Sequence, residues 1–330
     1  MTVGRNPWFS WARKWGISLA SLVSGLAVLF VFRRGLPDMA WLVGYLLLLW
    51  LVFAVFTELR APLEARGRRL VLDAADYTLQ TLYHNVLLFV LPSYYASATL
   101  ISRNVWFLLL VAGGALVTAV DPWYRAVVHP RRWLGRGLLA FSMFATLNVA
   151  LPLVGFRPFW ALEGSGVLCA LALTPALRRS GGSWTGAAVR AALFAGVVVV
   201  LLVPLRAWIP PAPLHLARAT LAWSVSGLEP VGPLQSPISA ANLRDLGGLV
   251  AYTAIYAPAG LREPVFHVWK KDGWPVATVP LSPVQGGRAE GFRTYSRKTD
   301  FGPSPEGRWE VDVVTEYGQL VGRLRFVVTE

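Results

Sequence analysis

The sequence is poor in cysteine and in charged residues. It has one cysteine, Cys169, among 330 residues, which excludes a disulfide framework and a metal site built on paired cysteines. Only 15% of its residues are charged, against roughly 25% in soluble proteins, whereas 55% are hydrophobic. Fifteen tryptophans and the aperiodic spacing of glycine argue against disordered and collagen-like chains. The composition is therefore typical of a membrane protein.

Acidic residues are scarce mainly in the first two thirds of the chain. Residues 1–210 hold 19 Lys and Arg against 7 Asp and Glu, whereas residues 211–330 hold 12 against 11. The net charge of +13 therefore belongs to the hydrophobic part of the chain. Membrane topology explains a basic excess in that part better than recognition of phosphates does, so we expect no nucleic-acid partner.

Long apolar runs recur through this hydrophobic part. Each run is close to the ~20 residues that cross a bilayer as a helix, so the sequence predicts a bundle of about seven transmembrane helices. One or two fewer spans would result if a run were re-entrant. The first run does not resemble a cleaved signal peptide, because it ends in Phe-Arg-Arg and another run follows at once. The runs are Trp15–Phe32, Met39–Thr57, Tyr77–Ser102, Asn104–Val120, Gly137–Phe156, Pro158–Leu177 and Ala191–Leu205.

Basic residues are distributed unevenly among the segments that flank these runs. The N-terminal segment and the loops after the second, fourth and sixth runs together hold 14 Lys and Arg, and the other loops hold four. Because cytoplasmic loops are enriched in Lys and Arg, this pattern predicts a cytoplasmic N-terminus. With an odd number of spans, the C-terminal part is then periplasmic or extracellular. We expect a multi-pass protein of the bacterial cytoplasmic membrane, with the lipid bilayer as its first partner.

The composition changes after the last apolar run. Residues 211–246 are rich in Gly, Pro and Ser and are predicted to be a linker, with an amphipathic element that can lie on the membrane. Residues 247–330 contain short alternating segments, so they predict an exported, all-β sandwich of immunoglobulin-like type. Residues 1–210 form the helical transmembrane domain. The predicted strands are Leu249–Tyr256, Val265–Lys271, Val276–Leu281, Phe292–Lys298, Arg308–Thr315 and Leu320–Thr329.

Several motifs of the C-terminal part occur together. They are Phe266–Trp269, Gly291–Lys298, Gly307–Thr315 and Gly318–Gly322, and in this combination the chain resembles a bacterial family of unassigned function. Members of that family look like polytopic inner-membrane proteins that end in a β-sandwich module. The resemblance covers the C-terminal part well and the helical part more loosely. It implies the architecture, and it brings no activity, cofactor or catalytic residue.

One polar stripe is predicted at the start of the third apolar run. Asp73, Asp76, Gln80 and His84 follow one another at helical spacing, which places them on one face of a helix. Acid and imidazole groups at membrane depth can bind a divalent ion or move a proton. In the alternative interpretation, the two acids pair with Arg66–Arg69 and the histidine makes a helix–helix hydrogen bond. Metal-motif spacing is missing, so we predict neither a metal nor a cofactor.

Other polar residues lie within predicted apolar or strand segments. Glu163 could be a proton or cation ligand, or could pair with Arg157, whereas Asn148 is predicted to make a helix–helix hydrogen bond. His267 alternates with Trp269 on one strand face, which is typical of a packed residue.

A basic stripe is predicted on one strand of the C-terminal part. Arg293 and Arg297 share a strand face with Tyr295 between them, and Arg288 is near in sequence. Guanidinium groups arranged in this way suit an anionic lipid, an envelope glycan or an acidic loop of another membrane protein. In the alternative interpretation, nearby acidic residues balance a solvated face.

The sequence contains no nucleophile elbow, phosphate loop or dinucleotide-binding motif. We therefore interpret the chain as a binding or scaffold protein rather than an enzyme, in which the exported sandwich recognises an envelope component or a partner protein. Two alternatives stay open. One is a transporter or intramembrane enzyme that uses Asp76, His84 and Glu163. The other is a membrane sensor that couples binding by the C-terminal part to a cytoplasmic partner.

Overall fold

The computed structural model describes residues 39–178 and 182–330, and the chain divides into two compact units. Of the described residues, the helical unit comprises those up to Pro92 together with Leu108–Ala150 and those within Leu162–Val203. The β unit comprises Ser93–Phe107, Leu151–Ala161 and Pro204–Glu330. The first predicted span, Trp15–Phe32, lies outside the described residues.

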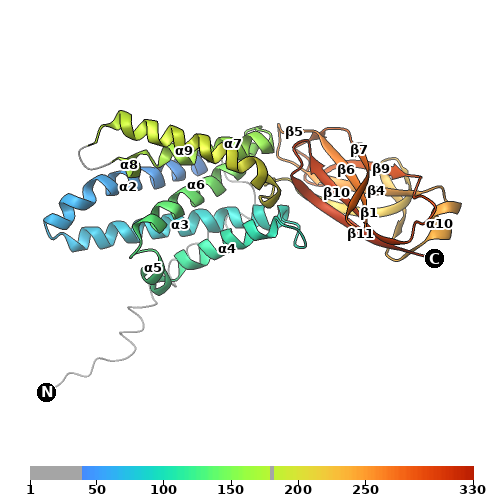
Figure 1. The fold of residues 1–330 in the computed structure, drawn as a ribbon, viewed down its shortest axis with the longest axis horizontal. Helices are drawn as coiled ribbons and strands as arrows, with labels where there is room; N and C mark the ends of the chain where they lie inside the picture. The colour runs from blue at the N-terminus through green and yellow to red at the C-terminus, as the bar shows by residue number, and fades with distance from the viewer. Residues whose placement is uncertain (1–38, 179–181) are drawn as a thin grey trace, which may run out of the picture. The chain divides into compact units, whose positions relative to one another are not determined.

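Largely apolar segments form the longer helices, which Figure 1 labels; most of their charged side chains lie towards the helix ends, and α3 also carries Asp73 and Asp76 in its first half. A break occurs where Pro122 occupies the first turn of a new helix, because proline cannot continue the preceding hydrogen-bond ladder. There α4 and α5 meet at an angle of 104°. The helices are α2 (Met39–Ala65), α3 (Arg69–Ser97), α4 (Val105–Ala119), α5 (Asp121–Val127), α6 (Arg132–Leu153), α7 (Pro158–Ala172), α8 (Thr174–Leu177) and α9 (Trp184–Leu205).

Three helices in the described part of the chain are long and apolar enough to cross a membrane: Gly44–Ala65, Arg132–Leu153 and Trp184–Trp208. The bent pair α4 and α5 makes a fourth if it is counted as one span. Fewer helices meet this criterion than the sequence predicted for two physical reasons. α3 carries polar side chains through its first half, and α7 is only 15 residues long, which is shorter than a membrane-crossing helix.

The candidate spans expose much of their apolar surface. Only 17% of the apolar window of Trp184–Trp208 and 22% of that of Gly44–Ala65 is buried, against 50% for Arg132–Leu153. Leu193, Val197 and Val200 of α9 are each more than half exposed. A contiguous apolar surface of this kind is typical of helices that contact lipid or another apolar surface.

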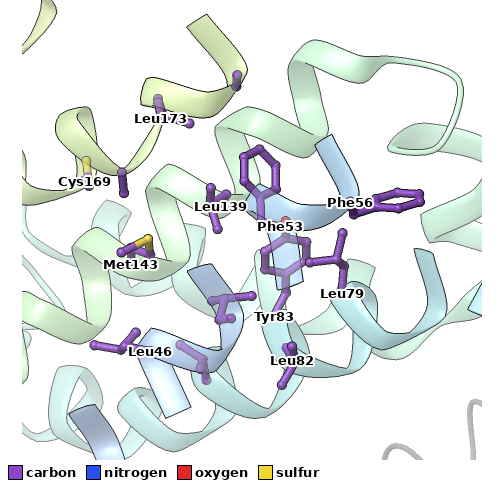
Figure 2. Packing of buried hydrophobic residues seen from close by; sticks show 14 of the residues in the cluster. Leu46, Phe53, Phe56, Leu79, Leu82, Tyr83, Leu139, Met143, Cys169 and Leu173 are labelled. Atoms are coloured by element: carbon purple, nitrogen blue, oxygen red, sulfur yellow. The ribbon is translucent and has the colours of Figure 1, made fainter. Parts of the chain in front are cut away.

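The core of the helical unit is formed by side chains from α2, α3, α6 and the α7–α8 region (Figure 2). Trp50 of α2 donates a hydrogen bond from Nε1 to the carbonyl oxygen of Ala172, at 3.0 Å, at the edge of this core. The lone cysteine lies in the same cluster, so it is a packing residue. Labelled members are Leu46, Phe53, Phe56, Leu79, Leu82, Tyr83, Leu139, Met143, Cys169 and Leu173.

Two antiparallel sheets dominate the β unit. One has the strand order β2-β1-β4-β9 and the other β3-β11-β10-β6-β7, in which only the short β3–β11 pairing is parallel; β5 and β8 form a separate small ladder. The elements are β1 (His215–Ser226), β2 (Glu229–Leu234), β3 (Ile238–Ser239), α10 (Ala240–Asp245), β4 (Leu249–Tyr256), β5 (Arg262–Glu263), β6 (Val265–Lys271), β7 (Trp274–Pro280), β8 (Val284–Gln285), β9 (Phe292–Lys298), β10 (Gly307–Thr315) and β11 (Leu320–Thr329).

Four of the six predicted strands, β4, β6, β9 and β11, have the predicted bounds, and the other two differ by one or two residues. The hairpin between β6 and β7 turns at Asp272 and Gly273, whose φ angles are 49° and 88°. Positive φ at both central residues matches the twist of the flanking strands, which is why Asp-Gly is favoured there.

The prediction of a linker at residues 211–246 is wrong. β1 lies inside the first sheet, paired with β4 from His215 to Ala222, and Leu221 and Ala222 are buried. Two of the prolines and one of the glycines that suggested a linker (Pro230, Pro233 and Gly232) lie in β2, which is an edge strand, where missing backbone donors are tolerated. The segment predicted as an amphipathic membrane-lying element is therefore a strand.

The inner faces of the two sheets share one core. Leu249 and Ala251 come from the first sheet, and Trp269, Trp309 and Phe326 come from the second. The rings of Trp309 and Phe326 stack with centroids 6.2 Å apart, and Trp269 meets Phe326 edge-on. Aromatic pairs in these geometries add to the stabilisation that burial alone provides.

Candidate functional site

The four residues of the predicted polar stripe on α3 lie in two different environments. Asp73 is exposed, whereas the side chain of Asp76 is 18% exposed and contacts a histidine and an arginine. The Oδ2 atom of Asp76 lies 3.3 Å from Nε2 of His129, and Oδ1 lies 3.8 Å from Nη1 of Arg60. Asp76 therefore pairs with a cation of α2 and a histidine after α5, rather than with the Arg66–Arg69 loop.

The other two residues of the stripe face α4. The amide nitrogen of Gln80 donates to the carbonyl of Thr118 at 2.9 Å and to Oδ1 of Asp121 at 2.7 Å. Nδ1 of His84 lies 3.1 Å from the carbonyl of Ala115, so this nitrogen carries the proton and donates it. Both side chains are buried. Gln80 and His84 thus bind one helix to the next, and the four residues do not form one site.

A cavity of about 260 Å³ lies beside Asp76 in the helical unit, and we call it the basic pocket. Its charged lining combines four arginines and one histidine with two carboxylates: Arg60, Arg132, Arg136, Arg178, His129, Glu64 and Asp76. Its apolar lining includes Phe53, Phe56, Leu79, Tyr83 and Tyr124. Figure 2 shows that Phe53, Phe56, Leu79 and Tyr83 lie close together at one end of the core cluster.

Ion pairs join the loops that surround the basic pocket. Nε of Arg60 lies 2.9 Å from Oε1 of Glu64, and Nη2 of Arg132 lies 3.5 Å from the same oxygen. Arg178 pairs with Glu58 at 3.0 Å. Residues that follow the second, fourth and sixth predicted runs therefore meet in one place. The sequence counted these arginines for topology, and it gave no signal that they line a common cavity.

The outer face of β9 carries the predicted basic stripe. Thr294 and Ser296 point inwards and are buried, whereas Tyr295 between the two strand arginines is 45% exposed. The guanidinium of Arg293 lies 2.8 Å from Glu229 and 3.1 Å from Glu290. These contacts hold Arg293 in place while the tyrosine ring remains accessible.

Arg297 and Arg288 are held differently. Nη2 of Arg297 donates to the carbonyl oxygens of Leu246 and Gly247, at 3.1 and 3.0 Å. The guanidinium of Arg288 lies 5.4 Å from the ring centroid of Phe292. Both side chains retain donors that are not used by these contacts, because a guanidinium has five N–H groups.

A buried hydrogen-bond chain links the two sheets. Trp269 donates from Nε1 to Oγ of Ser296 at 3.0 Å, so the hydroxyl proton of Ser296 is directed to Nδ1 of His267 at 2.8 Å. Nε2 of His267 then donates to Oγ1 of Thr253 at 3.1 Å, which assigns the tautomer. Burial lowers the pKa of His267 to about 4. Because His267 is fully buried, this Ser–His contact is structural.

Arg157 forms a second buried charge cluster in the β unit. Its Nε lies 3.0 Å from Oε2 of Glu263, a carboxylate that is 1% exposed, and its Nη2 contacts Glu316. Burial raises the pKa of Glu263, and the neighbouring Arg157 partly offsets that rise. Tyr317 stacks on Phe159 with ring centroids 4.1 Å apart. The structure therefore pairs Arg157 with two carboxylates of the strand region.

The remaining predicted polar residues are buried in helices. Glu163 of α7 is 8% exposed and Asn148 of α6 is 2% exposed. Neither belongs to the lining of the basic pocket. Within residues 39–178 and 182–330, no group of three or more His, Cys, Asp or Glu side chains is placed to hold a metal ion.

Two family models match the chain. One, described as a family of unknown function (DUF5924), matches residues 8–250, and the other, described as a protein of unknown function (DUF2914), matches residues 262–328. No curated protein matches the chain. The first match includes β1, β2, β3 and the start of β4, so the boundary between the matches falls inside the β unit. Since that match spans well over half of the sequence, the chain belongs to the DUF5924 family of unknown function.

Proposed function

We propose that this chain is a multi-pass protein of the bacterial cytoplasmic membrane that presents an immunoglobulin-like sandwich outside the cytoplasm, where it binds an envelope component or a partner protein. The strand order carries the proposal. β1-β4-β9 in one sheet and β11-β10-β6 in the other correspond to A-B-E and G-F-C of immunoglobulin-like domains. That architecture recurs in many cell-surface domains.

Two observations support the membrane part of the proposal. The exposed apolar surfaces of α2 and α9 suit a lipid environment. Arginines from three predicted cytoplasmic loops line one pocket, as expected if those loops share one side of a bilayer. Seven spans, with Trp15–Phe32 as the first, would then place the sandwich on the opposite side.

The outer face of β9 is the proposed binding surface. Tyr295 offers an exposed ring beside Arg293, and the side chain of Glu290, which pairs with that arginine, is 82% exposed. Exposed ion pairs contribute little free energy, so a ligand carboxylate or phosphate can replace Glu290 at the guanidinium. The face therefore suits an anionic lipid, an envelope glycan or an acidic loop of a partner.

A transporter or intramembrane enzyme is supported less well. Such a protein would need Asp76, His84 and Glu163 along one path. In the described part of the chain, Asp76 lines the basic pocket, whereas His84 and Glu163 do not. A membrane sensor would use the same β9 face, and differs from a scaffold only in having a cytoplasmic partner.

Binding by residues 209–330 tests the proposal, with vesicles of phosphatidylglycerol and isolated cell-wall sacculi as probes. Arg293→Ala with Arg297→Ala should weaken binding to one of these probes several-fold, because the two guanidinium groups that would contact an anion are removed. Added salt should weaken the wild-type interaction as well. Arg262→Ala with Arg308→Ala is the matched control, because it removes two exposed arginines from other strands. Equal losses in both double variants, or no binding by the wild-type fragment, would contradict the proposed surface.

A further inference from the structure

We propose that the basic pocket of the helical unit binds a phosphate group, carried either by the headgroup of an anionic lipid or by free phosphate. The inference is independent of the β9 surface. The first observation is the excess of basic groups in the lining, where four arginines and one histidine face two carboxylates, and, in the described part of the chain, only Arg178 is paired with a further carboxylate, that of Glu58. A pocket lined by more basic than acidic groups attracts anions, so such a lining favours an anion as its occupant.

The second observation is that part of this charge is not engaged by the described residues. The side chain of Arg132 is 67% exposed, and its ion pair with Glu64 is long, at 3.5 Å. Arg136 lines the same pocket and has no ion pair with any side chain in residues 39–178 and 182–330. A planar guanidinium group can donate two hydrogen bonds to two oxygens of one phosphate. Arg132 and Arg136, which lie one helical turn apart, therefore suit a phosphate ligand.

The third observation is how the remaining cations are held. Asp76 contacts both His129 and Arg60, and the guanidinium of Arg60 also lies 5.3 Å from the ring centroid of Phe56. Asp76 is thus a positioning residue that holds Arg60 and His129 at the pocket wall. The wall of the same pocket is partly aromatic, with a lining that includes Phe53, Phe56, Tyr83 and Tyr124.

The volume restricts the ligand further. A cavity of about 260 Å³ is smaller than the ~300–1,000 Å³ of sites that hold drug-sized ligands. A phosphate with a small substituent fits this space, whereas a nucleotide would be too large. Basic pockets between helices on the cytoplasmic side are also a known arrangement for lipid headgroups.

The test uses the full chain in a neutral detergent, with thermal unfolding followed by tryptophan fluorescence. Inorganic phosphate is titrated at constant ionic strength, and short-chain phosphatidylglycerol is titrated against short-chain phosphatidylcholine. A ligand that binds only the folded protein raises Tm in a saturable manner. A rise with inorganic phosphate indicates free phosphate, and a rise with phosphatidylglycerol alone indicates a lipid headgroup. No saturable rise with either, or an equal rise with phosphatidylcholine, would overturn the proposal.

Variants locate the site. Arg132→Ala with Arg136→Ala should weaken binding of the active probe by about tenfold or more, because two charge-assisted contacts are lost. Arg125→Ala with Arg131→Ala removes the same charge from the same region and does not touch the pocket lining, so its affinity should stay within about twofold. If both double variants lose affinity equally, the effect belongs to the overall charge of the loop and the pocket is not the site.

A third variant has the opposite predicted sign. Glu64→Gln removes the carboxylate that competes for Arg60 and Arg132, and the side chain of Glu64 is 41% exposed, so the fold should tolerate it. Affinity for the same probe should rise about threefold as those guanidiniums are released. If the double arginine variant fails to fold, this variant still tests whether the basic pocket binds phosphate. Unchanged or weaker binding by a folded Glu64→Gln protein would refute the phosphate site.

Discussion

Several buried polar residues in this chain have partners that lie far away in the sequence. The sequence placed His267 on an inward strand face, since alternation with Trp269 is a local pattern. It could not identify Ser296 and Thr253 as the partners of His267, because these lie on two other strands. The same holds for the basic pocket, where Arg60 and Arg178 are far apart in sequence and only tertiary packing brings them together.

Protonation of His267 should make the β-sheet region less stable in acid. Its pKa is about 4 in the folded state and about 6.5 when unfolded, so the unfolded chain binds more protons between these values. Stability is therefore fully present above about pH 6.5 and falls as the pH drops towards 4, by about 2 kcal/mol between pH 7 and pH 4.5. Urea denaturation of residues 209–330 at these two pH values measures the change.

The control for this prediction is His267→Gln, which cannot take up a proton. The variant loses stability at pH 7, because Ser296 and Thr253 lose a well-placed partner. Its stability should then fall less than that of the wild type between pH 7 and pH 4.5. Identical pH dependence in both proteins would mean that His267 does not titrate as its burial implies.

Secondary-structure elements followed the sequence where one periodic signal dominated. β6, β9 and most of β11 alternate, and β4 is a short apolar run that ends before Pro258 and Gly260, so the bounds of these four strands could be predicted. β1 was missed because it borders β2, an edge strand with two prolines, and the two together resemble a linker. In the helical part, α3 combines the length of a span with the polarity of a surface helix, so hydropathy alone does not classify it.

β1 should be required for the β-sheet region to fold. A fragment of residues 209–330 should unfold cooperatively, whereas one of residues 247–330 should be molten or insoluble. The shorter fragment leaves the backbone groups of β4 that face β1 without partners and removes Leu221 and Ala222 from the core. Near-ultraviolet circular dichroism and urea denaturation compare the two fragments. Equal cooperativity in both would show that β1 is dispensable.

Across the whole molecule, the proposed topology rests on charge and on apolar length together. Three candidate spans, or four with the bent pair, are found in the described residues, and the first predicted run lies outside them. Helix length alone does not fix on which side the chain ends. The uneven loop charges predict that side, because 14 of the basic residues counted fall on one set of segments.

Reporter fusions should therefore locate the C-terminal end outside the cytoplasm. Alkaline phosphatase fused after Glu330 should be active, and green fluorescent protein at the same point should be dark, because each folds on one side only. A fusion within the loop at Arg66–Arg69 is the internal control and should give the reverse pattern. Fluorescence from the fusion after Glu330 would contradict the predicted orientation.

The boundary between the two family matches has a consequence for how this protein can be inherited and engineered. Residues matched by DUF5924 provide β1 and the start of β4, and residues matched by DUF2914 provide β6, β7, β9, β10 and most of β11. A crossover between residues 250 and 262 would therefore separate β1 and the start of β4 from β9, which pairs with β4, and from β6, β10 and β11 of the second sheet, which share their core. A hybrid made by exchanging the C-terminal part between relatives should therefore fold only when the junction lies before β1, because both sheets then come from one parent.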